Sequence, residues 1–131
     1  MRAAVLDASV AIGLLDAQDA HHEAAWREPH ALVDAGALIV LPVTAYAEVL
    51  VGVLRGGAQS EQIFTMFCTE LVGEIAPATE DTAVIAARLR HRHAGLRLLD
   101  SLVIAAGEEL GAEVLTAERR WRGYSDRVRV V

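Results

Sequence analysis

The sequence predicts an α/β fold, in which a central parallel sheet of four to five strands lies between two layers of helices. The runs RAAVLD (2–7), ALIVLP (37–42) and AEVLTA (112–117) are almost wholly apolar, as strands buried on both faces are. Segments with helical periodicity separate these runs. Because parallel strands need long crossover connections, this alternation predicts a three-layer α/β/α arrangement.

Proline, glycine and capping residues set the boundaries of the expected elements. Pro29 is expected to interrupt or kink the second helix, and Gly56 with its neighbouring glycine closes the third. Ser60 and Thr79 are candidate N-caps of the two helices that follow. In chain order, the expected strands are residues 2–7, 37–42, 72–78, 112–117 and, at an edge, 127–131, and the expected helices are 8–18, 19–36, 43–57, 60–71, 79–95 and 97–111.

The last expected helix carries a carboxylate beside its apolar residues. Its apolar face is predicted from residues at three- and four-residue spacing, namely Leu99, Leu102, Val103, Ala106 and Leu110. Asp100, at the start of this helix, shares a face with Val103 and Ile104. Asp100 is therefore expected to be either a helix cap or part of a site.

The composition favours one globular domain covering residues 1–131. Hydrophobic residues make up 53% of the chain, and its mean hydropathy is +0.32. The longest apolar stretch contains Glu48 and Pro42, so no membrane span of ~20 apolar residues is expected. The N-terminus does not resemble a signal peptide, and the single cysteine, Cys68, excludes an internal disulfide. We therefore expect a cytoplasmic protein.

Charge and the absence of lysine narrow the classes of function. Residues 1–85 carry three arginines against twelve acids, whereas residues 86–131 carry nine arginines against six acids. The second part can present an anion-binding face, but charge alone favours an ordinary solvated helix face. Without lysine the chain has no P-loop and no Schiff-base chemistry, and it lacks the lysine that a phosphorylated receiver domain normally uses.

Four acids lie at positions that a parallel sheet can bring to one edge. Asp7 ends the first strand, Glu118 follows the fourth, Asp100 opens a helix and Glu48 lies within an apolar helix. Converging carboxylates repel one another, and a hard divalent cation such as Mg²⁺ or Mn²⁺ relieves that repulsion. Each acid also has a simpler interpretation. Asp7 and Asp100 can cap helices, Glu48 can face solvent, and Glu118 can pair with a neighbouring arginine.

Four blocks of the sequence resemble a known family when they are taken in order. They are VLDASVAIGLL, DAHHEAAW, LPVTAYAEVLVGVLRG and LRLLDSLVIAAGEELGAEVLTAERRW. With them, nearly the whole chain resembles a PIN domain, specifically the VapC-type toxin of bacterial VapBC toxin–antitoxin pairs. The resemblance implies that Asp7, Glu48 and Asp100 bind metal. It also implies that Ser9 and Thr116 are the small hydroxyl residues that orient acids or waters near it.

One acid departs from the family pattern, because Glu118 stands where the family usually has aspartate. The resemblance implies a fourth catalytic and metal-binding carboxylate here, but the extra methylene can move it outward or make it bind through water. It further implies that Arg97, Arg119 and Arg120 are candidates for binding RNA phosphates. Trp121 can stack on a base or pack against the last strand.

The resemblance implies a Mg²⁺- or Mn²⁺-dependent endoribonuclease that hydrolyses RNA phosphodiester bonds. The implied partners are a cognate VapB-type antitoxin, an RNA substrate and a second copy of the chain in a homodimer, with no membrane. The alternative is a catalytically impaired PIN-like module that binds antitoxin or RNA without cleaving.

Overall fold

A five-stranded parallel sheet forms the centre of the computed structural model, which describes residues 2–131. Its strands are β1 (Ala3–Leu6), β2 (Leu38–Pro42), β3 (Glu74–Ala76), β4 (Glu113–Thr116) and β5 (Val128–Val130). Their order across the sheet is β3-β2-β1-β4-β5, and all neighbouring pairs are parallel. The predicted parallel sheet is confirmed, and β5 is an edge strand as expected.

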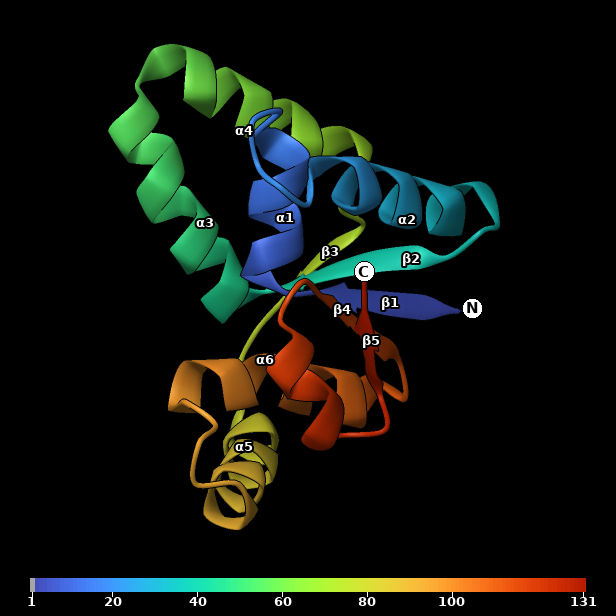
Figure 1. Cartoon of the computed structure of the whole chain (residues 1–131), viewed down its shortest axis with the longest axis vertical. Coiled ribbons are helices and arrows are strands. Elements are labelled where there is room, and N and C mark those ends of the chain that lie inside the picture. Colours follow the sequence, from blue (N-terminus) through green and yellow to red (C-terminus); the bar gives the residue numbers. More distant parts are fainter. Residues whose placement is uncertain (1) are drawn as a thin grey trace.

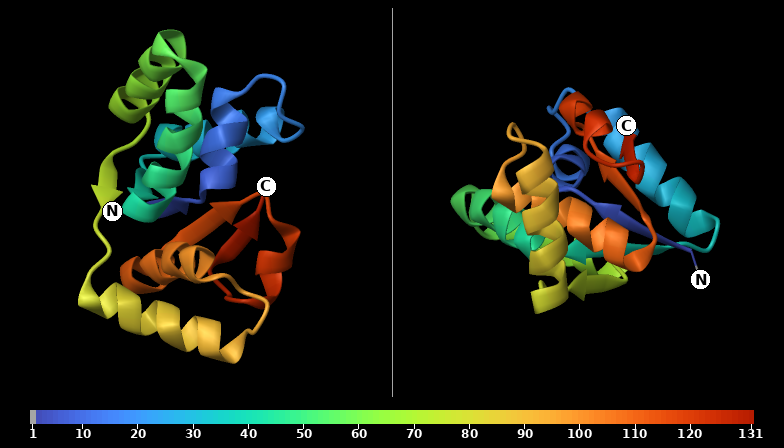
Figure 2. Two further views of the ribbon diagram at one scale, coloured as in Figure 1. Left: turned by 90° about the vertical axis from the view of Figure 1, so that its left-hand side faces the viewer. Right: turned by 90° about the horizontal axis from the view of Figure 1, so that it is seen from below.

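Helices cover both faces of this sheet (Figures 1 and 2). One layer contains α1 (Ala8–Leu15), α2 (His22–Asp34), α3 (Val43–Gly56) and α4 (Ala58–Glu70). The other contains α5 (Glu80–Arg92) and α6 (Leu98–Leu110), and a short 3-10 helix, η1 (Arg119–Gly123), connects β4 to β5. The predicted three-layer arrangement is therefore confirmed.

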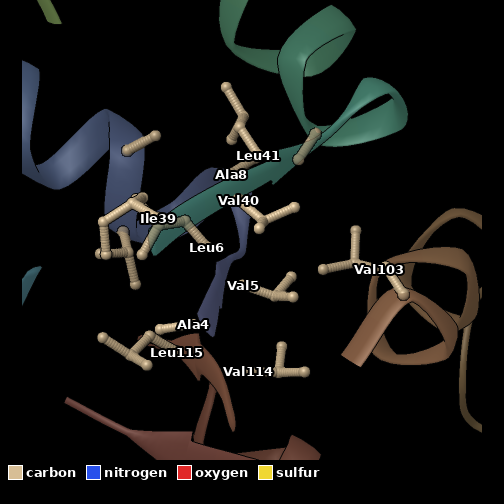
Figure 3. Close-up of a cluster of buried hydrophobic side chains, with 14 of the residues drawn as sticks. Ala4, Val5, Leu6, Ala8, Ile39, Val40, Leu41, Val103, Val114 and Leu115 are labelled. Carbon is tan, nitrogen blue, oxygen red and sulfur yellow. The ribbon is translucent and has the colours of Figure 1, made fainter. Parts of the chain in front are cut away.

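Alternate side chains of the central strands fill the two sides of the core (Figure 3). Val5 is in register with Val40 on one side and Val114 on the other, and all three point toward Val103 of α6. Gly107 lets α6 lie close to β4, because a Cβ added there would be 2.2 Å from Val114 Cγ2. Both faces of the central strands are thus buried, as their unbroken apolar sequence predicts.

Two details of the predicted helices differ from the structure, namely an interruption at Pro29 and a cap at Ser60. The helix α2 is not interrupted at Pro29, which is buried within its 13 residues while α2 packs against α1 and β2. This packing offsets the hydrogen bond that proline cannot donate. Ser60 is not an N-cap, because α4 begins at Ala58 after Gly57, whose φ is 84°. The Thr79 cap is confirmed, since its side chain accepts a hydrogen bond from the backbone N–H of Thr82.

The predicted apolar face of the last helix is wrong in part. Val103 and Ala106 are buried, but Leu99 and Leu110 are 52% and 48% exposed. Most buried residues of α6 are small; the full set is Ser101, Val103, Ile104, Ala105, Ala106 and Gly107. Small side chains allow a closer approach to the sheet than leucines would, so packing distance and not hydrophobicity alone selects this face. In residues 2–131, every helix is too short or too polar to cross a membrane.

Candidate active site

Asp7 lies where β1 ends and α1 begins, and three donors hold its carboxylate. Its Oδ1 accepts a hydrogen bond of 2.8 Å from the backbone N–H of Ala8, so Asp7 does cap α1. Its Oδ2 accepts from the Ser9 hydroxyl at 2.7 Å and from the Thr116 hydroxyl at 2.9 Å. Ser9 and Thr116 are themselves fixed by accepting hydrogen bonds from the backbone N–H groups of Ala117 and Glu118. The carboxylate is therefore held in one orientation.

The carboxylate of Asp7 is a buried charge without a cationic partner. The residue is 6% exposed, and within residues 2–131 no ion pair reaches it. Burial raises the pKa of Asp7 to about 6, and the negative charge of Asp100 adds to the rise. The hydrogen bonds from Ser9 and Thr116 oppose the rise without cancelling it. A positive ion at this carboxylate would therefore be stabilised.

Asp100 lies within α6 and not at its cap. The N-cap is Arg97, whose side chain makes no capping hydrogen bond, so the cap interpretation of Asp100 is wrong. The Asp100 side chain is 13% exposed, and its Oδ2 lies 3.2 Å from the Nε of Arg97. The charge of Asp100 raises the pKa of both Asp7 and Glu48. Asp100 on α6 therefore interacts electrostatically both with Asp7, at the start of α1, and with Glu48, on α3.

Glu48 projects from α3 beside the first turn of α6. The residue is exposed, which agrees with the simpler interpretation that it faces solvent. Partial burial nevertheless raises its pKa, as does the charge of Asp100, whereas the charge of Arg97 lowers it. Glu48 and Arg97 line a shallow hollow of about 430 Å³ together with Leu98 and Leu99. An exposed glutamate can therefore still contribute its carboxylate to this end of the sheet.

Glu118 and its arginine neighbours form the outer rim. Glu118 is exposed at the start of η1, and within residues 2–131 it forms no ion pair with Arg119, Arg120 or any other arginine. Its charge raises the pKa of Arg97, so it lies on the same side of the molecule as the other acids. Arg119 and Arg120 are exposed, whereas Trp121 is 2% exposed and packs in the core. Trp121 is therefore not a surface for base stacking.

The chemistry of these donors fits a hard divalent cation. They are carboxylates, and the charge of Asp100 raises the pKa of the two nearest acids, which is the repulsion that a cation relieves. As the side chains stand in residues 2–131, no three acidic, histidine or cysteine residues are close enough together to hold a metal ion. The long, exposed side chain of Glu48 would have to turn inward to join Asp7 and Asp100.

The contact between Arg97 and Asp100 is the feature that the sequence analysis missed. Arg97 was predicted only as a candidate for binding RNA phosphates. The signal was present, because Arg97 and Asp100 are three residues apart and such pairs meet on a helix. In the structure Arg97 is the N-cap residue of α6, and its side chain still reaches Asp100.

Comparison with known proteins gives one family and a set of similar folds. The family model described as PIN domain matches residues 4–126. VapBC2 from Rickettsia felis, solved bound to a DNA fragment from its promoter, is similar with a TM-score of 0.79 and 12% identity, covering 98% of this chain and 97% of that one. No curated protein sequence matches the chain.

Two further solved structures share the fold. A toxin–antitoxin complex from Klebsiella pneumoniae has a TM-score of 0.76 and 21% identity, covering 96% of this chain and 95% of that one. VapC20 from Mycobacterium tuberculosis, described as a sarcin-ricin loop cleaving toxin, has a TM-score of 0.70 and 18% identity, covering 94% and 97%. At these identities the likeness shows that the folds agree over almost their whole lengths.

Proposed function

The chain belongs to the PIN domain family, and from this we propose that residues 1–131 form one PIN domain that acts as an endoribonuclease toxin. It would hydrolyse RNA phosphodiester bonds with the help of Mg²⁺ or Mn²⁺ and be neutralised by a VapB-type antitoxin. The similar structures from Rickettsia and Klebsiella are toxin–antitoxin complexes, and the one from Mycobacterium cleaves the sarcin-ricin loop, which supports this class. Such a toxin would act in the cytoplasm, where RNA is made.

The buried carboxylate of Asp7 is the observation that carries the proposal. Asp7 caps α1, but an aspartate with that role alone would be stabilised further by an arginine partner or by exposure to water, and within residues 2–131 Asp7 has neither. Instead Ser9 and Thr116 hold its Oδ2 while the charge of Asp100 lies nearby. Carboxylates kept together at an energetic cost are typical of functional sites.

The roles of the acids follow from their positions. Asp7, Asp100 and Glu48 would hold the cation, which when bound activates water and neutralises charge on the scissile phosphate. Ser9 and Thr116 keep Asp7 deprotonated and oriented, because they donate to the same carboxylate oxygen. Glu118, at the rim, would supply a fourth carboxylate to the cation through its longer side chain.

Exposed arginines at the same rim supply a path for the RNA backbone. Arg97 lines the hollow next to Glu48, and Arg119 and Arg120 follow Glu118 in η1. The guanidinium groups of Arg119 and Arg120 are free to bind phosphate oxygens, since they form no ion pair within residues 2–131, whereas Arg97 would have to leave Asp100 first. We propose that they position the substrate while the acids act on it.

Two exposed apolar surfaces fit protein partners. A hollow of about 470 Å³ between α1, α2 and α4 is lined mainly by apolar residues, and Trp26, Ile63 and Met66 in its walls are exposed. We propose that an apolar segment of the antitoxin fills it. On α3, Val51 and Leu54 are exposed and outside this hollow. We propose that they contact a second copy of the chain in a homodimer.

Asp100→Asn tests the enzymatic proposal. This variant should lose at least a hundredfold of the Mn²⁺-dependent cleavage of a transfer RNA and ribosomal RNA mixture, while its circular dichroism spectrum stays unchanged. Asp126→Asn, an exposed aspartate in the loop before β5, removes the same charge and should cleave like the wild type. Cleavage at the wild-type rate by Asp100→Asn, or cleavage that persists in EDTA, would contradict the proposal.

Calorimetric titration with Mn²⁺ separates the alternative function. A PIN-like module that only binds antitoxin or RNA would neither bind Mn²⁺ nor cleave. The absence of any group of three acids close enough for a metal in residues 2–131 gives this alternative its support. Binding of Mn²⁺ that is weakened by Asp100→Asn would exclude it.

A further inference from the structure

Arg97 places the cationic part of its side chain against an acid whose side chain is largely buried. Its Nε lies 3.2 Å from Asp100 Oδ2. The Asp100 side chain is 13% exposed, whereas that of Arg97 is 77% exposed. The pair therefore joins a carboxylate fixed in the fold to a cation that projects from the surface. Such a cation can leave its partner without opening the core.

The charge of Arg97 also acts on the neighbouring acids. The contact with Asp100 is the main cause that raises the pKa of Arg97, and the charges of Glu48 and Glu118 add to it. In return, Arg97 lowers the pKa of Glu48. Within residues 2–131 no other arginine forms an ion pair with Asp7, Glu48, Asp100 or Glu118. Within the described residues, Arg97 is thus the arginine that pairs with one of these acids, Asp100, and its charge also acts on Glu48 and Glu118.

We propose that Arg97 is a built-in counter-ion that competes with the divalent cation for Asp100. The inference rests on the proposed function, because it takes Asp7, Glu48 and Asp100 as the acids that hold the metal. A guanidinium on Asp100 Oδ2 uses one acceptor of a metal ligand, and its positive charge repels a second cation at the same place. Metal binding therefore requires Arg97 to move away, which its exposure permits.

This competition makes Arg97 a residue that sets metal affinity. An ordinary surface ion pair between residues three apart would have no such effect, since it contributes little and no site depends on it. A unit charge about 6 Å from a divalent ion changes its binding constant by on the order of tenfold, even at the dielectric constant of water. Removing the charge should thus tighten metal binding, and added salt should reduce the gain.

The test compares Mn²⁺ binding by calorimetry for the full chain and three variants, without RNA. Arg97→Gln should bind Mn²⁺ about five- to tenfold more tightly than the wild type, and this gain should shrink when the salt concentration is raised. Arg97→Lys keeps the charge and should bind within about twofold of the wild type. Arg90→Gln removes the charge of an exposed arginine on α5 that forms no ion pair with any residue from 2 to 131, and this variant should also bind like the wild type.

The outcomes separate this inference from the proposed function. If the wild type binds Mn²⁺ and cleaves RNA but Arg97→Gln binds equally or more weakly, the counter-ion role is wrong while the proposed function stands. If Arg90→Gln gains as much as Arg97→Gln, the effect is one of net charge and the role of Arg97 is again wrong. If no variant binds Mn²⁺ and none cleaves, both fall together.

Discussion

Replacing Asp7 by asparagine should stabilise the fold at neutral pH. Asparagine has nearly the same shape, and the hydroxyls of Ser9 and Thr116 can each donate or accept, so both can still bond to it. The rise in pKa from 3.8 to about 6 means that ionising Asp7 costs the folded state about 3 kcal/mol at neutral pH. The hydrogen bonds to a neutral amide are weaker than those to a carboxylate, and this difference lowers the stability of the variant by about 1 kcal/mol or somewhat more. The expected net gain is therefore about 1–2 kcal/mol.

The gain should depend on pH with a definite sign. A carboxyl whose pKa is raised on folding binds its proton more tightly in the folded state, so its cost is greatest above about pH 6 and disappears as the pH falls toward 3.8. Urea unfolding in EDTA at pH 7.5 should show Asp7→Asn to be more stable than the wild type. At pH 4.5 the two proteins should be nearly equal.

Asp126→Asn is the matched control for this measurement. Asp126 is exposed, so its replacement should change the free energy of unfolding by less than about 0.5 kcal/mol at either pH. The reasoning fails if Asp7→Asn is less stable than the wild type at pH 7.5. It fails equally if the gain in stability is the same at both pH values, because a gain without pH dependence cannot come from the buried charge.

Two other changes test the packing of α6 and the partner surface. Gly107→Ala should lower the free energy of unfolding, measured in urea, by about 1–3 kcal/mol, because the added Cβ would be 2.2 Å from Val114 Cγ2. Gly52→Ala, in α3, should raise the free energy of unfolding by about 0.5–1 kcal/mol, because a Cβ there would meet no atom of another element of residues 2–131 within 4 Å. Equal effects of the two would contradict the close packing. Met66→Glu should reduce co-purification with a co-expressed VapB-type antitoxin, the partner proposed for the hollow that Met66 lines. Leu110→Glu, exposed to a similar degree on α6, should leave it unchanged.

The sheet and the position of Asp7 were predictable because both depend on local sequence. An unbroken apolar run such as that ending at Leu6 is stable only with both faces covered, which requires the helical layers. An acid immediately after such a run lies at the carboxyl end of its strand whatever the rest of the chain does. The hydrogen bond from Thr116 to Asp7 then follows from the pairing of β1 with β4.

The boundaries of helices and the buried face of α6 depended on contacts that the sequence does not state. Pro29 stays within α2 because that helix packs on α1 and β2. The tendency of proline to break helices is a local property, so it cannot predict the stabilisation that this packing gives. Leu99 and Leu110 fit helical periodicity but are exposed, because β4 approaches α6 closely at Gly107 and smaller residues therefore form the buried face. The placement of Glu48 and Glu118 relative to Asp100 likewise depends on how three separate elements meet.

The bond between Thr116 and Asp7 has a consequence for how the protein is made. These residues are 109 positions apart, and β4, which carries Thr116, pairs directly with the first strand. A ribosome makes Asp7 well before it makes Thr116. A nascent chain that stops before β4 leaves β1 with a free edge and Asp7 without one of its donors. The end of the sheet at which Asp7 lies is therefore completed only after β4 has been made, so a translation product interrupted before β4 would not carry it.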